Sequence, residues 1–245
     1  MENIGDLLIE IPTVDSTNIY AMQQVHARLA KHGTAYFAHE QTQGKGQRGR
    51  SWESRLGDNI ILSVVYEPLQ LPASSVFLFS SAIAVACYNF CKVYTGDEMS
   101  IKWPNDLYWR DRKAGGILVE NVFRGSTWEW AIVGIGLNIN QVEFSENLTN
   151  PVSFRQITGK TFPVLQLARE LCLHLQQSWE HLIAGGDEIL KTYNNALYKR
   201  GETVKMKQSA RVFEARIDGV NKNGQLEVFT AIPETFNHGD VSWIL

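Results

Sequence analysis

The segment from Gln41 to Trp52 carries residue types that bind anionic ligands. It reads Gln-Thr-Gln-Gly-Lys-Gly-Gln-Arg-Gly-Arg-Ser-Trp, so residues 44–50 hold three glycines and three cations. Glycines let the backbone approach a ligand and present its N–H groups, and cations neutralise phosphate oxygens. The glycine spacing matches neither a P-loop nor a dinucleotide fingerprint. On composition alone, a solvated flexible loop is the commoner explanation, and an RNA-binding arm is a second alternative.

A second segment places two lysines on either side of a turn. Lys102-Trp103-Pro104-Asn105-Asp106 is followed by Arg112-Lys113-Ala114-Gly115-Gly116-Ile117-Leu118-Val119-Glu120. Asn-Asp after a proline often forms only a turn. A lysine that reaches a reacting phosphate or carboxylate in a dry site contributes several kcal/mol. Lys102 and Lys113 can therefore converge on one anion from the two sides of the turn.

A third segment, Val133-Gly134-Ile135-Gly136-Leu137-Asn138-Ile139-Asn140, ends a predicted strand. Two glycines there allow the close approach of another backbone or of a flat ligand, although such glycines are also common packing features. Asn138 supplies an amide donor and acceptor.

The elements that must position these segments follow from hydrophobic periodicity. Strands are predicted at residues 7–11, 35–39, 59–66, 101–103, 116–123 and 127–135, the third of them buried on both faces. Helices are predicted from the N-cap candidates at 15–18 to about residue 31, and at 75–94, 162–184 and 186–198. Beyond Arg200, short alternating runs at 203–207, 211–220, 225–229 and 241–244 indicate a small β-barrel appended to a mixed α/β domain.

The composition is that of an ordinary globular protein of 245 residues, with 44% hydrophobic and 20% charged residues. A net charge of −3 argues against non-specific binding to nucleic acid or to membrane surfaces. Cys87, Cys91 and Cys172 are expected to be buried free thiols, since no Cys/His pairs stand at a zinc spacing. The start lacks a signal peptide, and no run is expected to span a bilayer, which favours a cytoplasmic protein.

In this order, the three segments resemble the motifs of the biotin–protein ligase family. That family has a Gly-Arg-Gly-Arg-Arg-Gly-Arg loop, a Lys-Trp-Pro-Asn-Asp motif with a downstream Arg-Lys-x-x-Gly-Ile-Leu-Val-Glu, and a Gly-x-Gly-x-Asn strand end. Asp15-Ser16-Thr17-Asn18 matches a fourth family motif, and the resemblance covers about residues 7–245. It implies an α+β fold, in which a mixed β-sheet with flanking helices (the class II synthetase-like catalytic domain) spans residues 1–199. A small C-terminal SH3-like β-barrel is then expected at 200–245.

The resemblance also implies an activity. The chain is expected to be a carbon–nitrogen ligase that forms biotinoyl-5'-AMP from ATP and biotin with Mg²⁺. It then transfers biotin to a lysine of a biotin carboxyl carrier protein. Because the chain starts at the catalytic domain, it is expected to bind no DNA. The net charge predicts no membrane binding. Either a monomer or a homodimer is expected.

The family's functional residues carry over by motif position. The biotin-binding residues implied are Ser16, Thr17, Gln41, Gly44, Lys45, Lys113, Gly134 and Gly136. Those implied for ATP and the adenylate are Lys45, Gln47, Arg48, Arg50, Trp52, Lys102, Asn105 and Asn138. The catalytic residues implied are Lys113, Lys102, Asp106 and Arg50, with Asp106 also the Mg²⁺ ligand.

Three rival functions are weighed against this resemblance. A lipoate–protein ligase shares the fold and the adenylation chemistry, but its Arg-Arg-x-Ser-Gly-Gly-Gly signature is missing. An octanoyltransferase needs a cysteine nucleophile near a lysine, and none of the three cysteines lies in such a motif. A non-catalytic nucleic-acid or ligand-binding module is the alternative from a different class.

One departure from the family yields a prediction. Gln47 stands where the family has an arginine that helps to hold the adenylate, and Lys45 replaces another arginine without its bidentate fork. We therefore expect the adenylate to be retained less tightly here, unless Arg48 substitutes. The off-rate of preformed adenylate should fall in Gln47→Arg; equal off-rates in the variant and the wild type would show that this position does not control retention.

Overall fold

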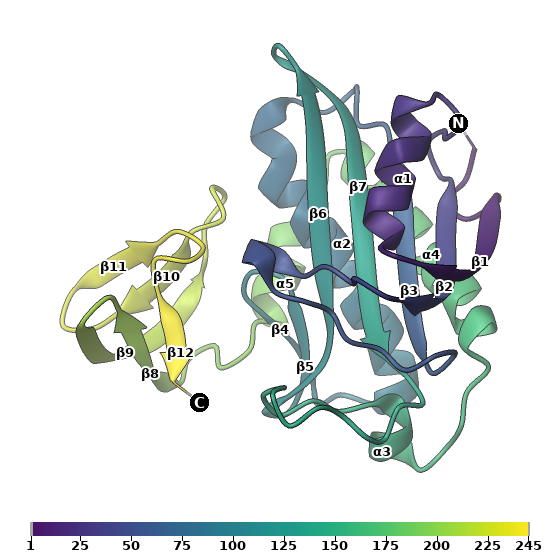
Figure 1. Cartoon of the computed structure of the whole chain (residues 1–245). Helices are drawn as coiled ribbons and strands as arrows, with labels where there is room; N and C mark the ends of the chain where they lie inside the picture. The colour runs from purple at the N-terminus through teal and green to yellow at the C-terminus, as the bar shows by residue number, and fades with distance from the viewer. Residues whose placement is uncertain (1, 245) are drawn as a thin grey trace.

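The computed structural model describes residues 2–244, which form two β-sheets and the helices around the larger one (Figure 1). The larger sheet has the order β1-β2-β3-β7-β6-β5-β4. Its strands are β1 (Leu8–Val14), β2 (Ala35–Gln41), β3 (Asn59–Tyr66), β4 (Met99–Lys102), β5 (Asp106–Trp109), β6 (Arg112–Arg124) and β7 (Thr127–Asn138). β1 and β2 are parallel and the other neighbours are antiparallel. The predicted mixed sheet is confirmed.

The centre of the molecule is β3, which is buried along its whole length. Ile60, Leu62 and Val64 pack into the main core under α2 (Val76–Thr95) and α4 (Val164–Ile183). Val65 points to the opposite face, where α1 (Thr17–His26) covers a smaller apolar cluster. The continuous apolar run at residues 59–66 predicted a strand buried on both faces, and β3 confirms this.

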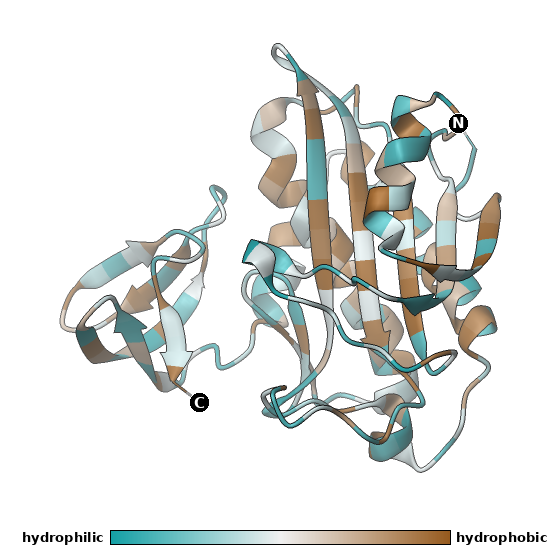
Figure 2. Cartoon of the chain, viewed as in Figure 1, coloured by the Kyte–Doolittle hydropathy of each residue, from teal (hydrophilic) through white to brown (hydrophobic). Residues whose placement is uncertain are grey.

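On the α1 side, the helix packs mainly against β2, β3 and β7. The part of this face over β6 and β5 is left to the loop that follows β2, which contains the short helix η1 (Gln47–Gly49) (Figure 1). β6 and β7 carry apolar bands in this region, whereas the loop in front of them is mostly hydrophilic (Figure 2). The sheet thus provides an open floor that only the loop covers.

The second sheet is antiparallel, with the order β11-β10-β9-β8-β12. Its strands are β8 (Thr203–Gln208), β9 (Arg211–Val220), β10 (Leu226–Phe229), β11 (Pro233–Phe236) and β12 (Ser242–Ile244). Alternate side chains such as Met206, Ile217 and Phe236 form its buried interior. This small barrel-like unit, predicted from the short alternating runs, lies on the β4–β5 side of the larger sheet (Figure 1).

Several element boundaries differ from the prediction. Helix α1 ends at His26 and not near Lys31, because Arg28 adopts a left-handed conformation with φ 59°. The remaining helices are the short α3 (Phe154–Thr158) and η2 (Ala73–Ser75), and α5 (Ile189–Asn195). β5, α3 and β11 were not predicted; the start of β5 was interpreted as a turn because Asn105-Asp106 follows a proline.

The prediction that no run is long enough to span a bilayer was wrong. By length and composition alone, the helical segment Ala73–Thr95 could cross a membrane. Here 56% of its apolar window is buried, and α2 packs against α4 and the sheet. The helix therefore has the environment of a core helix. Cys87, Cys91 and Cys172 are buried free thiols, as predicted.

Candidate functional site

A cavity of about 1050 Å³ lies between the floor of the larger sheet, the loop after β2 and the second sheet. The residues predicted for the site that line it are Ser16, Thr17, Gln41, Lys45, Gln47, Arg48, Arg50, Trp52, Lys102, Asn105, Asp106, Lys113, Gly134, Gly136 and Asn138. Gly44 is not among the lining residues. Gly44 is buried inside the loop itself, where a Cβ would overlap the Trp52 carbonyl and come within 2.8 Å of Gln41 Nε2.

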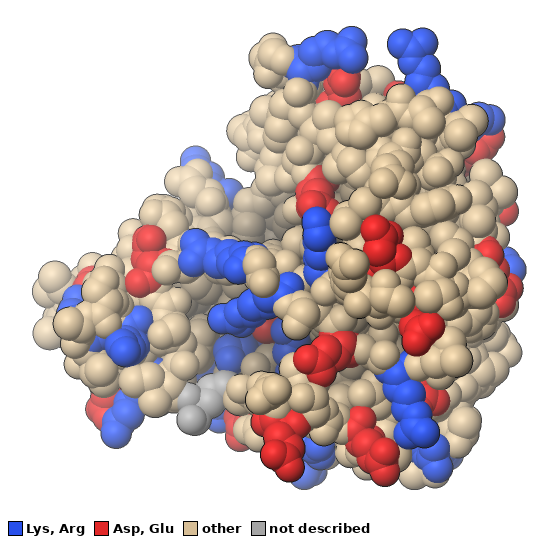
Figure 3. Space-filling model, viewed as in Figure 1, with Lys and Arg blue, Asp and Glu red and all other residues tan. Residues whose placement is uncertain are grey.

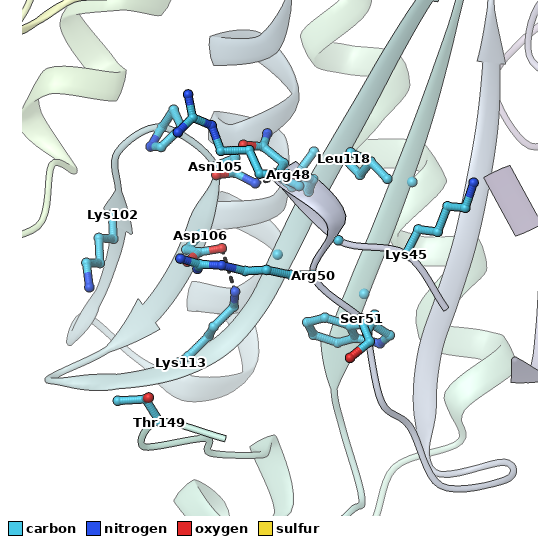
Figure 4. Close-up of a pocket in the computed structure, with 18 of the residues that line it drawn as sticks. Lys45, Arg48, Arg50, Ser51, Lys102, Asn105, Asp106, Lys113, Leu118 and Thr149 are labelled. Atoms are coloured by element: carbon cyan, nitrogen blue, oxygen red, sulfur yellow. Dashed lines mark hydrogen bonds and ion pairs between the residues drawn. The ribbon is translucent and has the colours of Figure 1, made fainter. Parts of the chain in front are cut away.

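The charged centre of the cavity is an ion pair. Lys113 Nζ lies 2.7 Å from Asp106 Oδ1, both side chains partly exposed to the cavity. β5 places Asp106 at its first residue, paired with Gly116 of β6, and Lys113 lies three residues earlier on that strand. Arg50 extends from the loop toward this pair (Figure 4). Lys113 and Arg50 thus face one carboxylate of the chain itself, whereas the second segment predicted that Lys102 and Lys113 converge on a bound anion.

Lys102 lies beside this pair in an aromatic surround. Its Nζ donates to Tyr108 Oη at 3.1 Å and lies 5.7 Å from the ring centroid of Tyr198 and 5.6 Å from that of Trp243. The Lys102 pKa is lowered to about 8, mainly because the amine is buried; the Asp106 charge opposes this shift, and the charges of Lys113 and Arg50 add to it. Lys102 is therefore mostly protonated at neutral pH but loses its proton under mildly basic conditions, and a bound anion would favour the protonated form.

A second, uncharged region is built on the start of α1. The backbone N–H and the hydroxyl of Thr17 donate to Gln41 Oε1 at 2.8 and 3.0 Å. Ser63 Oγ lies 2.7 Å from Thr17 Oγ1 and 2.6 Å from Asn18 Oδ1. Asn18 Nδ2 donates to Glu120 Oε2 at 2.8 Å. The network fixes Thr17, Asn18 and Gln41 in the wall of the cavity.

The two glycines of β7 leave room for side chains, and this explains their place in the strand. At Gly134, a Cβ would come within 2.9 Å of Asn18 Cγ. At Gly136, it would come within 2.6 Å of Trp52 Cζ2, so the indole of the loop lies flat against the strand. The close approach predicted for these glycines is therefore made by Asn18 and Trp52 of the chain itself.

Two predicted amides hold backbone in this structure. Asn138 Nδ2 donates to the Val152 carbonyl at 3.2 Å, and Asn105 Nδ2 donates to the Ile117 carbonyl at 2.5 Å. The first ties the segment after β7 to the sheet. The second extends the pairing with β6 to the residue just before β5 begins.

The loop cations point in different directions. Arg50 faces the Asp106–Lys113 pair, whereas Lys45 points away from it (Figure 4). Arg48 Nη2 donates to the His238 carbonyl of the second sheet at 2.8 Å. Gln47 Oε1 is buried without a hydrogen-bond partner in the described part of the chain. Arg48 therefore does not take over the position of Gln47 here.

The sequence missed part of the lining. The stretch after β7 contributes Asn147, Leu148, Thr149 and Pro151, and the second sheet contributes Lys207, Ser209, His238, Gly239, Val241, Ser242 and Trp243. The first group follows the Gly-x-Gly-x-Asn segment directly, and this proximity was the available signal. The second group carries no local signal, because only the docking of the two sheets brings it to the cavity.

Lys and Arg side chains gather along the hollow between the two sheets, although the chain is slightly acidic overall (Figure 3). Asp106 and Glu53 are the acidic residues of the lining. No cluster of three metal-ligating side chains occurs among residues 2–244. The hollow is thus suited to a polyanion, with one carboxylate at its centre.

Comparisons with known proteins place this geometry in context. The model of the biotin/lipoate A/B protein ligase family matches residues 10–138, slightly more than half of the chain. The bifunctional ligase/repressor BirA of Escherichia coli K12 is 34% identical over 146 residues, 60% of this chain and 44% of that protein. The biotin–[acetyl-CoA-carboxylase] ligase of Paracoccus denitrificans is 33% identical over 59% of this chain and 61% of that protein. The chain thus spans about half the length of the curated relatives it matches.

Among solved structures, the biotin protein ligase from Aquifex aeolicus in complex with biotin and ATP superposes with a TM-score of 0.82 at 23% identity. The superposition covers 98% of this chain and 99% of that one. This likeness establishes the fold, including the second sheet.

The lowered pKa of Lys102 gives a pH prediction. Only the protonated amine attracts a polyphosphate, so affinity for inorganic triphosphate should fall as pH rises through about 8. Calorimetric titration between pH 7 and 9 measures the effect, and Lys102→Met should flatten the profile. An unchanged slope in Lys102→Met would assign the titration to another group.

Proposed function

Because the chain belongs to the biotin/lipoate A/B protein ligase family, we propose that it is an ATP-dependent biotin–protein ligase. The reaction forms biotinoyl-5'-AMP and transfers biotin to a lysine of a biotin carboxyl carrier protein. The observation that carries this proposal is the pairing, in one cavity, of a cationic centre at Lys102, Arg50 and Lys113 with an uncharged polar end at Ser16, Thr17 and Gln41.

The first half-reaction joins two anions. The carboxylate of biotin attacks the α-phosphorus of ATP, an acyl–phosphate bond forms, and pyrophosphate leaves. Lys113 and Arg50 offset the repulsion between the carboxylate and the phosphate and stabilise charge on the phosphoryl oxygens. Lys102 holds the leaving pyrophosphate. No nucleophilic side chain is needed, because the attacking group belongs to the substrate.

The uncharged end suits the ureido head of biotin, which both donates and accepts hydrogen bonds. Ser16 and Thr17 carry hydroxyls and Gln41 an amide, so the set can satisfy both kinds of group. Trp52 offers an apolar face beside Gly136 for the rest of the ligand. Lys45 and Asn138 complete the sets proposed for biotin and for the nucleotide.

Mg²⁺ is the metal proposed for this reaction, where it would neutralise phosphate charge. Asp106 would give it one carboxylate oxygen, with Asn105 beside it, and phosphates and water would give the rest. A single carboxylate fits this ion, which keeps several waters and binds chiefly through substrate phosphates. The residues present therefore suit it.

In the second half-reaction, the amine of the carrier lysine attacks the acyl carbon and AMP leaves. The amine must lose a proton to attack, and we assign the proton acceptor role to Asp106. We also propose that residues 1–199 form the catalytic domain and residues 200–245 a separate SH3-like domain.

The substrate is tested by the acid that drives the reaction. With labelled ATP, biotin should release pyrophosphate and label a carrier domain, whereas lipoate should do neither. Release with lipoate alone would make the chain a lipoate–protein ligase. Release with neither acid would reject both ligase functions.

The base role of Asp106 is tested in the transfer half-reaction, and the pH dependence of transfer distinguishes it from the loss of the ion pair with Lys113. Asp106→Asn should slow transfer from preformed adenylate to the carrier by about 10²-fold or more, the range for a lost general base. The deficit should shrink at higher pH, where more of the carrier amine is already neutral. An unchanged transfer rate would remove the base role and leave a metal role open.

A further inference from the structure

The tip of the Gly-rich loop (Gln41–Trp52) is fastened to the second sheet. Arg48 Nη2 donates to the His238 carbonyl at 2.8 Å, across 190 residues of sequence. The guanidinium also lies directly against Gly239, where a Cβ would overlap it. Only glycine at position 239 leaves space for this contact.

The backbone conformation of Arg48 directs its side chain toward the second sheet. Arg48 has a φ of 57°, in the left-handed region that residues other than glycine seldom occupy. Figure 4 shows Arg48 and Arg50 leaving the same short turn, Arg50 toward Asp106 and Arg48 away from it. A strained residue at the tip of a loop indicates a conformation that its surroundings maintain.

The base of the same loop is fixed to the larger sheet. The indole of Trp52 packs on Gly136, and the backbone N–H of Trp52 donates to the Gly44 carbonyl at 2.9 Å. Gly46 donates to the Arg50 carbonyl at 2.7 Å, so the loop closes on itself as a narrow hairpin. The hairpin is thus held at two ends, by β7 at its base and by the second sheet at its tip.

The receiving turn, residues 237–240, is itself well fixed. The Asn237 N–H donates to Asp240 Oδ2 at 2.8 Å, and the Asp240 N–H donates to the Asn237 carbonyl at 3.0 Å. The His238 ring packs edge-on against Trp103 at 5.9 Å, and Trp103 Nε1 donates to the Gly224 carbonyl at 3.0 Å. The turn is therefore a rigid anchor next to Lys102.

We propose that the 237–240 turn is a positioning element that holds the Gly-rich loop closed over the cavity through Arg48, and so sets how long the acyl-adenylate is retained. This inference rests on the proposed function for its kinetic consequence. With Gln47 contributing no charge to the ligand, the closed position of the loop depends on the fastening at its tip. The second sheet then acts on the reaction without touching the reacting atoms.

The test replaces Gly239 and uses a matched glycine as control. Gly239→Ala inserts a Cβ into the space of the Arg48 guanidinium. Gly201→Ala, in the turn before β8 and at φ 80° against 90° for Gly239, imposes similar backbone strain, but nothing lies within 4 Å of its Cβ. Thermal melts of both variants establish that each is folded. Any difference between them then reports the contact with Arg48.

The first readout needs no catalysis. Hydrogen exchange of peptides covering residues 43–52 in the unliganded protein should be about tenfold faster in Gly239→Ala, the size expected from losing one charge-assisted hydrogen bond. Gly201→Ala should match wild type. Arg48→Gln should behave like Gly239→Ala, and the double variant should add nothing further, since both remove one interaction. Equal loop exchange in Gly239→Ala and Gly201→Ala would overturn the proposal.

The second readout is release of preformed adenylate, which should rise by a similar factor in Gly239→Ala and stay unchanged in Gly201→Ala. An unchanged release rate despite faster loop exchange would overturn the link to retention. Should the wild type form no adenylate at all, the proposed ligase function fails, and the exchange measurement still decides whether the turn holds the loop.

Discussion

The charge arrangement around Asp106 is the constraint on which the rest of the site depends. Lys113 lies 2.7 Å from this carboxylate, and Arg50 and Lys102 lie near enough for their charges to act on one another. Like charges this close repel one another when no anion is bound, and in this arrangement one carboxylate is the common counter-charge. A polyanionic substrate would supply further negative charge, so this arrangement favours the binding of such a ligand.

This arrangement requires a floor on which side chains and ligand can lie flat. β6 and β7 provide it because Gly134 and Gly136 carry no side chain into the cavity, and Asn18 and Trp52 occupy the space. β3 pairs with β7 along its whole length and is buried on both faces, so close packing holds this side of the floor in place. The loop cations are placed by this packing, through the indole of Trp52, as much as by their attraction to Asp106.

The second sheet completes the site from the other side. Trp243 closes the aromatic surround of Lys102, and the turn at His238 and Gly239 receives Arg48. Both contacts act on cations, one by excluding water and the other by directing a side chain. The acidic net charge of the chain is consistent with this, because the positive potential is local to one hollow.

The sequence alone determined the long elements and the chemical character of the site. β3, α2 and the β6–β7 hairpin have runs long enough to impose their own periodicity, and the three motif segments named most of the side chains that line the cavity. Only the tertiary structure decided which way each side chain points. Arg48 and Arg50 are two residues apart and of the same type, yet Arg50 extends toward Asp106 and Arg48 binds the His238 carbonyl. The contributions of Trp243 and Gly239, the burial of Gly44 and the role of Asn138 as a backbone ligand were equally hidden. Trp243 and Gly239 depend on partners far away in the chain, and local residue patterns carry no information about how the two sheets dock.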